Sequence, residues 1–105
     1  MIEKVLQEMV ERIRLGTHPD RIVLFGSRGR DAGHSQSDYD LLVVALSDLP
    51  RGRRTVSLYR LLAGVGVPKD IVWWTLEEVA DWQGVRSHFI STALREGKVL
   101  YEKPA

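Results

Sequence analysis

The chain has 105 residues, which fits one small domain spanning residues 1–105. Its 44% hydrophobic and 28% charged residues are typical of a globular protein and exclude a largely disordered chain. A net charge of +1 does not favour nucleic acid or a membrane as partner, and the lack of cysteine excludes disulfides and thiolate zinc sites. No stretch approaches the roughly 20 apolar residues that span a bilayer, and the start of the chain does not read as a signal peptide. We therefore expect a cytoplasmic protein.

The first third of the chain predicts a helix, a strand and a turn. Apolar side chains recur at helical spacing over residues 2–14, and Gly16 is the predicted stop. Residues 22–25 form a short apolar run typical of a buried strand, which ends at Gly26. The segment 28–37 contains glycines and serines and leaves room only for a short helical turn.

The middle of the chain predicts two further strands around a helix. Residues 38–46 form a strand that is apolar on both faces, which favours an interior position in a sheet. A helix is expected over residues 53–63, and a third strand over residues 70–75, rich in β-branched and aromatic residues. In that strand Trp73 and Trp74 should face opposite sides, one in the core and the other at a pocket or an interface.

The last third predicts two helices and a short strand. Thr75 followed by two acids is typical of a helix N-terminus. A last helix is expected over residues 85–96 and a short strand over residues 99–101. Trp82 is interpreted as a core residue, and the arginines near residue 53 as a solvated helix start. Strands interleaved with helices predict an α/β-type layer of helices on a small sheet.

Asp38 and Asp40 are the first candidates for a functional site. Side chains two apart in a strand project from one face, with Cα atoms about 6.5–7 Å apart. Two such acids beside an apolar run are unfavourable unless a cation or a partner neutralises them. Carboxylates suit Mg²⁺, and two ions at such a site promote phosphoryl and nucleotidyl displacement. The alternative is a pair of solvated residues at a strand edge.

Gly26 and Ser27 are candidates for phosphate binding. A glycine at a strand end allows close backbone approach, and the free N–H groups of a following helical turn favour a phosphate. The segment lacks the Gly-Lys-Ser/Thr of a P-loop and the G-x-G-x-x-G spacing of a dinucleotide fingerprint. The alternative for this dipeptide is an ordinary turn.

Asp70 is the third acidic candidate. It opens the apolar strand Asp70-Ile71-Val72-Trp73-Trp74. Alone it reads as a strand-end or turn residue. It becomes a site residue only if its strand lies beside the strand of Asp38 and Asp40.

These residues together carry a resemblance to a known family. Gly26-Ser27, then ten residues, then Asp38-Tyr39-Asp40 after Ser37 resembles the signature of the polymerase-β-type nucleotidyltransferase superfamily. The short length, Arg28, Arg30 and the ending Leu94–Glu102 resemble its minimal nucleotidyltransferase branch. The resemblance implies a polymerase-β-like fold, α+β or α/β, with helices packed on a small mixed β-sheet.

The resemblance also implies roles for individual residues. Three aspartates would bind the metal and carry out catalysis: Asp38, Asp40 and Asp70. The glycine turn and its neighbours would bind the nucleotide: Gly26, Ser27, Arg28 and Ser37. Glu77 and Glu78 are weaker matches for the third acid. The cofactor would be Mg²⁺ in a two-ion site. The reaction would transfer a nucleoside monophosphate, AMP from ATP, to an acceptor hydroxyl.

The resemblance further implies a partner protein. The minimal branch resembles antitoxins of toxin–antitoxin systems, whose partners are small helical toxins, and the acceptor would then be a hydroxyl on that partner. Members usually read Gly-Ser-x-Ala-x-Gly, whereas this chain has Gly29 and Asp31 at the last two defined positions. Asp31 adds negative charge near the expected phosphates. It therefore favours the alternative of a binding module that neutralises a partner by contact alone. The sequence does not set the oligomeric state.

Overall fold

The computed structural model describes residues 3–29 and 38–104. The helices and strands follow in the predicted order. They are α1 (Lys4–Thr17), β1 (Arg21–Phe25), α2 (Gly26–Gly29), β2 (Tyr39–Val44), α3 (Arg51–Leu61), β3 (Lys69–Trp74), α4 (Leu76–Trp82), α5 (Phe89–Glu96) and β4 (Lys98–Glu102). Among the described residues, no helix combines the length and the apolar character needed to cross a membrane.

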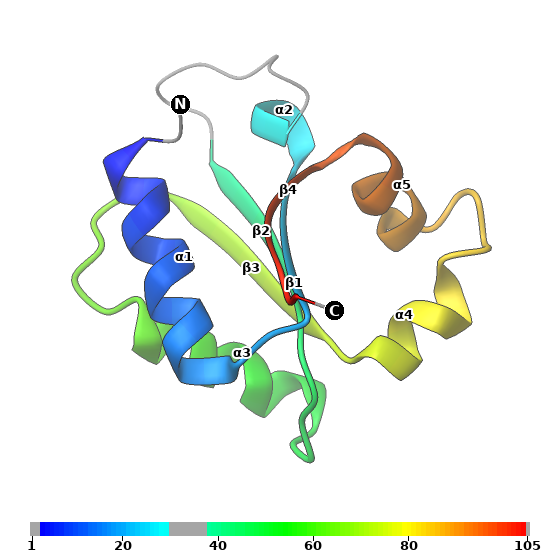
Figure 1. Ribbon diagram of the computed structural model, residues 1–105, viewed down its shortest axis with the longest axis horizontal. Coiled ribbons are helices and arrows are strands. Elements are labelled where there is room, and N and C mark those ends of the chain that lie inside the picture. Colours follow the sequence, from blue (N-terminus) through cyan, green and yellow to red (C-terminus); the bar gives the residue numbers. More distant parts are fainter. Residues whose placement is uncertain (1–2, 30–37, 105) are drawn as a thin grey trace.

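The strands form one mixed sheet in the order β3-β2-β1-β4. β1 runs antiparallel to both of its neighbours, whereas β2 and β3 are parallel and are connected through α3. Helices α1 and α3 cover one face of the sheet, and α4 and α5 cover the other (Figure 1). The structure therefore confirms the predicted fold, a small mixed β-sheet with helices packed on it.

Each face of the sheet has its own hydrophobic core. The α1–α3 face buries Met9, Ile13 and Leu58 against the sheet, and the α4–α5 face buries Val79 and Ile90. Trp73 and Trp74 point to opposite faces as predicted, but both are buried, one in each core. The indole N–H of Trp73 donates to the carbonyl of Ala45 at 2.8 Å. The expectation that one of the two lines a pocket or an interface is therefore wrong.

Two predicted helix ends are wrong. Helix α1 does not stop at Gly16 but continues to Thr17, and it ends where His18 adopts a left-handed φ of 48°. Gly16 instead lets α1 approach α3, because a Cβ there would overlap the side chain of Leu61. Helix α5 begins at Phe89 rather than at residue 85, since His88 caps it by accepting the backbone N–H of Ile90 at 3.2 Å.

Two side chains differ from their predicted environments. Trp82 is not a core residue: 44% of it is exposed, and its ring stacks on His88 with centroids 4.6 Å apart. Arg54 is buried rather than solvated, with its guanidinium 2.7 Å from Glu78. The start of α4 is as predicted, because Thr75 and Glu78 form a reciprocal capping box.

Candidate functional site

The predicted site residues meet at one edge of the sheet. In the register of the strands, Asp40 lies opposite Asp70 on β3 and opposite Phe25 on β1. Gly26 follows Phe25 directly, and Asp38 precedes β2 by one residue. Asp70 was a candidate only if its strand lies beside the strand of Asp40, and β3 does pair with β2. The parallel pairing of β2 with β3 brings the start of each strand to the same place.

The carboxylates at this edge repel one another. Asp40 is partly buried, whereas Asp38 and Asp70 are exposed. Burial raises the pKa of Asp40 above its ordinary value, and the negative charges of Asp70 and Asp38 raise it further. Within the described residues no arginine or lysine forms an ion pair with any of the three. A cation bound here would relieve this repulsion, which is the property expected of a metal-binding edge.

Gly26 closes the turn tightly against Asp40. Its φ is +70°, in the left-handed region that favours glycine, and a Cβ at this position would overlap the Oδ2 atom of Asp40. The turn therefore needs glycine for its backbone conformation and for space. Ser27 lies in α2 directly after it. Ser37, Arg30 and Asp31 lie outside the described residues, so their predicted parts stay predictions.

Arg28 has a structural role that the sequence did not indicate. Its guanidinium lies 3.9 Å from the centroid of the Tyr39 ring and 3.2 Å from Glu3. The Tyr39 hydroxyl donates to the other oxygen of Glu3 at 2.7 Å. Burial raises the pKa of Tyr39, and the hydrogen bond to Glu3 adds to that rise. The three side chains join α2, β2 and the start of α1.

Sequence reasoning missed Glu3 and Tyr39 for different reasons. Tyr39 stands between two aspartates in the strand, so its side chain must point to the opposite face, and that alternation was a usable signal. Nothing in the sequence places Glu3 near Arg28, because the contact depends on how α1 packs on the sheet. Arg28 is thus held by protein groups in this conformation, and a phosphate contact would compete with Glu3.

The weaker acidic candidates lie at the other end of the sheet. Glu77 and Glu78 belong to α4, which follows the end of β3, whereas Asp70 lies near its start. Burial opposes ionisation of Glu78, but hydrogen bonds from Arg54, the Thr75 backbone and Arg51 outweigh it and lower its pKa to about 2. Glu78 therefore stabilises the fold and does not belong with the three aspartates.

The aspartates fit Mg²⁺ as part of a site completed by substrate. No set of three or more acidic or histidine side chains in the described parts of the chain converges closely enough to hold a metal alone. Mg²⁺ commonly takes only one or two carboxylates and fills its remaining positions with water and substrate phosphates. Asp40 with either neighbour would supply that number.

Comparison with known proteins agrees with this geometry. The family model described as "Polymerase beta, Nucleotidyltransferase" matches residues 7–105. No curated protein matches the chain.

Among solved structures, the chain is similar to one in a crystal structure of a toxin–antitoxin with AMP-PNP, with 21% identity over 92% of this chain and 73% of that chain and a TM-score of 0.64. It is also similar to chains from two mutants of the toxin–antitoxin MntA-HpeT. One mutant carries two Asp-to-Glu substitutions (21% identity, 92% and 73% coverage, TM-score 0.58). The other carries a Tyr-to-Ala substitution (22% identity, 98% and 75% coverage, TM-score 0.61). At such identities the likeness concerns the fold.

Proposed function

The chain belongs to the polymerase beta nucleotidyltransferase family, and on that premise we propose that it is a metal-dependent nucleotidyltransferase. It would transfer a nucleoside monophosphate, with AMP from ATP as the first candidate, to an acceptor hydroxyl and release pyrophosphate. The observation that carries this proposal is the pairing of Asp40 with Asp70 at the edge where the Gly26 turn closes. An acid-rich edge beside a tight glycine turn suits a triphosphate with its magnesium ions.

The side chains at the edge would divide the work as follows. Bound magnesium would neutralise the triphosphate and help to align the attacking and leaving oxygens. Asp38, Asp40 and Asp70 would hold the ions, and Asp70 would also accept the proton of the acceptor hydroxyl. The turn at Gly26 would bring the backbone close to the phosphates, and the hydroxyls of Ser27 and Ser37 would donate to phosphate oxygens.

The proposed acceptor is a hydroxyl on a partner protein, and the chain would act as a cytoplasmic antitoxin. The comparisons support this, because structures with the same fold belong to toxin–antitoxin pairs, one of them with AMP-PNP. A partner protein that docks on the chain would supply the binding energy that orients its hydroxyl toward Asp70.

A second candidate function is neutralisation by contact without transfer. It is favoured by Asp31, which puts an acid where the family usually has glycine. It is also favoured by Arg28, whose guanidinium is engaged by Glu3 and Tyr39. Both features would weaken triphosphate binding.

One experiment separates the two functions. The protein is incubated with labelled ATP, Mg²⁺ and the product of the adjacent gene, and label on that product is counted. We expect transfer by the wild type and a loss of about 10²-fold or more in a variant combining Asp38→Asn with Asp40→Asn, because the metal ligands are gone. The matched control is Asp48→Asn, an exposed acid in the loop between β2 and α3.

The remaining outcomes are equally informative. A tight complex without label from wild type would support neutralisation by contact. A double variant that loses its circular dichroism signal would show that the aspartates are structural and that the site assignment is wrong. Full activity in a folded double variant would contradict the assignment as well.

A further inference from the structure

The surface beside the start of α4 carries two leucines that stay largely exposed. The chain covers other vulnerable surfaces, such as the outer edge of β3, where the Tyr59 hydroxyl bonds to backbone groups of Lys69 and Ile71. By contrast, Leu46 in the loop after β2 is 85% exposed, and Leu76, the first residue of α4, is 57% exposed. Both line the same hollow. Single exposed leucines are ordinary, but apolar side chains that gather at a hollow indicate a binding site for another molecule.

Leu76 also lines a second hollow, which is neutral and partly apolar. This neutral hollow has a volume of about 350 Å³, and its apolar lining includes Val44, Val79 and Leu94. The charged residues that line it balance, because two are acidic and two are basic: Asp20, Glu102, Arg21 and Lys103. The volume is large enough for a side chain of a partner. The neutral hollow therefore suits an apolar group rather than a charged one.

The hollow that Leu46 and Leu76 share is acidic. Its volume is about 470 Å³, and its lining has four carboxylates against one guanidinium: Asp20, Glu77, Glu78 and Asp81, and Arg54. Arg54 is engaged by Glu78 at 2.7 Å. Among residues 3–29 and 38–104, no ion pair reaches the other three acids of this lining. The acidic hollow therefore keeps a net negative charge, which a cationic group would balance.

The two hollows adjoin, and their shared residues are held firmly. Asp20 and Leu76 line both of them. The backbone N–H of Asp20 donates to the carbonyl of Val44 at 2.7 Å, and the carbonyl of Asp20 accepts from the N–H of Lys103 at 2.9 Å. The capping box at the start of α4 holds Leu76 in the same way. The surface is thus preformed, which lowers the entropy cost of binding.

We propose that the two adjoining hollows form a docking surface for one basic amphipathic segment of a partner protein. An apolar side chain of that segment would enter the neutral hollow against Val44 and Val79, and a lysine or arginine would enter the acidic hollow. Side chains one helical turn apart are neighbours on a helix surface, so a single helix can present both. The charges select this occupant, because the acidic hollow would repel an acidic segment.

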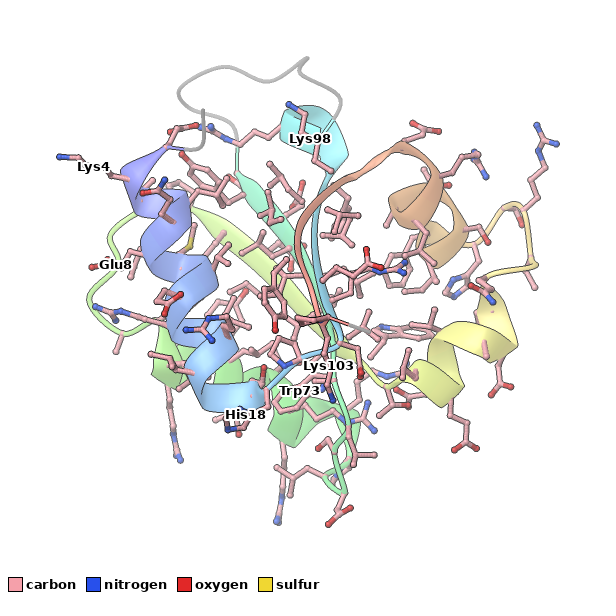
Figure 2. The ribbon with its side chains drawn as sticks, viewed as in Figure 1. Lys4, Glu8, His18, Trp73, Lys98 and Lys103 are labelled. Carbon is pink, nitrogen blue, oxygen red and sulfur yellow. The ribbon has the colours of Figure 1, made fainter. Side chains whose placement is uncertain are left out.

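The docking surface lies on the same face of the sheet as the aspartates but at the other end. Val44 follows Asp40 by four residues on β2, so their side chains share a face. Figure 1 shows α4 at the end of the sheet away from α2. Figure 2 shows Lys103, which lines the neutral hollow, and Lys98 at opposite ends of β4. A partner held here would leave the aspartates open for its acceptor hydroxyl. The choice of partner rests on the proposed antitoxin role, but the docking surface shares no residue with the aspartate edge.

Substitutions in α4 test the docking surface on the full chain. Calorimetry would measure binding of the adjacent gene's product, without nucleotide, to wild type, Leu76→Asp and Asp81→Lys. An acid is favourable in the first turn of a helix and a cation in the last, so both variants should fold, which circular dichroism checks. We expect each to raise the Kd at least about tenfold. The matched controls on α1 are Leu15→Asp, at a leucine that is 60% exposed, and Glu8→Lys, and both should bind like wild type.

Each other outcome decides against one part of the proposal. A wild type that does not bind, or α4 variants that bind like wild type, would overturn the docking surface, even if label is transferred. Tighter binding by Asp81→Lys would show that the partner is acidic at this point and would contradict a basic segment. Binding that depends on Leu76 and Asp81 while wild type transfers no label would refute nucleotidyl transfer and leave the docking surface intact.

Discussion

The two ends of the sheet use charge in opposite ways. At the far end, beyond β3, Glu78 has hydrogen bonds from Arg54, from Arg51 and from the Thr75 backbone. At the near end, Asp40 faces Asp70 and lies close to Asp38, and its pKa is raised. The far end is stable without any ligand, whereas the near end carries electrostatic strain that a cation would relieve. The lowered pKa of Glu78 thus marks an acid that stabilises the fold, whereas the raised pKa of Asp40 marks an acid whose charge a bound cation would stabilise.

Removing Arg54 should break the far end and have the largest effect on stability. Its guanidinium contacts Glu78 at 2.7 Å and the carbonyl of Leu49 at 2.8 Å, with 9% of its side chain exposed. We expect Arg54→Ala to lower the free energy of unfolding by about 3 kcal/mol, because it leaves polar groups without partners. Urea denaturation measures this. Exposed Arg53 in the same helix is the control, and Arg53→Ala should change stability by less than about 0.5 kcal/mol. An equal loss of unfolding free energy in Arg54→Ala and Arg53→Ala would show that burial of Arg54 does not contribute to stability.

Replacing Gly26 should damage the near end through the backbone. With φ of +70° and Asp40 in the space of a Cβ, Gly26→Ala should cost about 2 kcal/mol of unfolding free energy. Transfer of labelled AMP should fall with it, because the turn moves away from the carboxylates. The control is Gly52→Ala, since a Cβ there meets nothing within 4 Å and α3 should gain up to about 1 kcal/mol. A stable, active Gly26→Ala variant would show that the tight turn is dispensable.

The two ends of the sheet should also differ in how their contributions to stability depend on pH, and these effects are the smallest expected. Since folding lowers the pKa of Glu78 from 4.5 to about 2, its stabilisation is present above about pH 4.5 and is lost as the pH falls toward 2. The pKa of Asp40 shifts in the opposite direction. Its raised pKa costs stability at neutral pH, and this cost disappears as the pH falls through that pKa toward its ordinary value of 3.8.

Two variants measure these signs in urea titrations from about pH 7 to pH 3. Glu78→Gln should be less stable than wild type by about 1–2 kcal/mol at neutral pH, and the gap should narrow in acid. Asp40→Asn should be more stable by less than about 1 kcal/mol, since solvent screens a partly exposed carboxylate, and this gap should also narrow in acid. Saturating Mg²⁺ should remove the advantage of Asp40→Asn. If both variants were more stable than wild type, or both less stable, the two ends of the sheet would not differ in the way proposed.

The near end was largely predictable because its information is local. The spacing of Asp38 and Asp40 in an apolar strand, and a glycine at a strand end, follow from chain geometry alone. Asp70 was only conditionally predictable, because which strands pair in parallel depends on the crossover through α3. Metal and nucleotide roles for these residues stay predictions that the proposed transfer assay tests.

The far end was not predictable because its information is tertiary. Four arginines around α3 look alike in sequence, and only the docking of α4 decides that Arg54 is the buried one. Trp82 was misplaced for the same reason, since its stacking on His88 depends on a turn between α4 and α5. The Thr75 capping box, a local feature, was predicted correctly.

The Tyr59 hydroxyl on the β3 edge has a consequence for assembly. An open edge strand can pair through its backbone groups with a strand of another molecule. The Tyr59 hydroxyl donates to the carbonyl of Lys69 and accepts from the backbone N–H of Ile71, each at 3.3 Å, so these two groups are not available to an incoming strand. A single phenol would thus hinder strand addition at this part of the sheet.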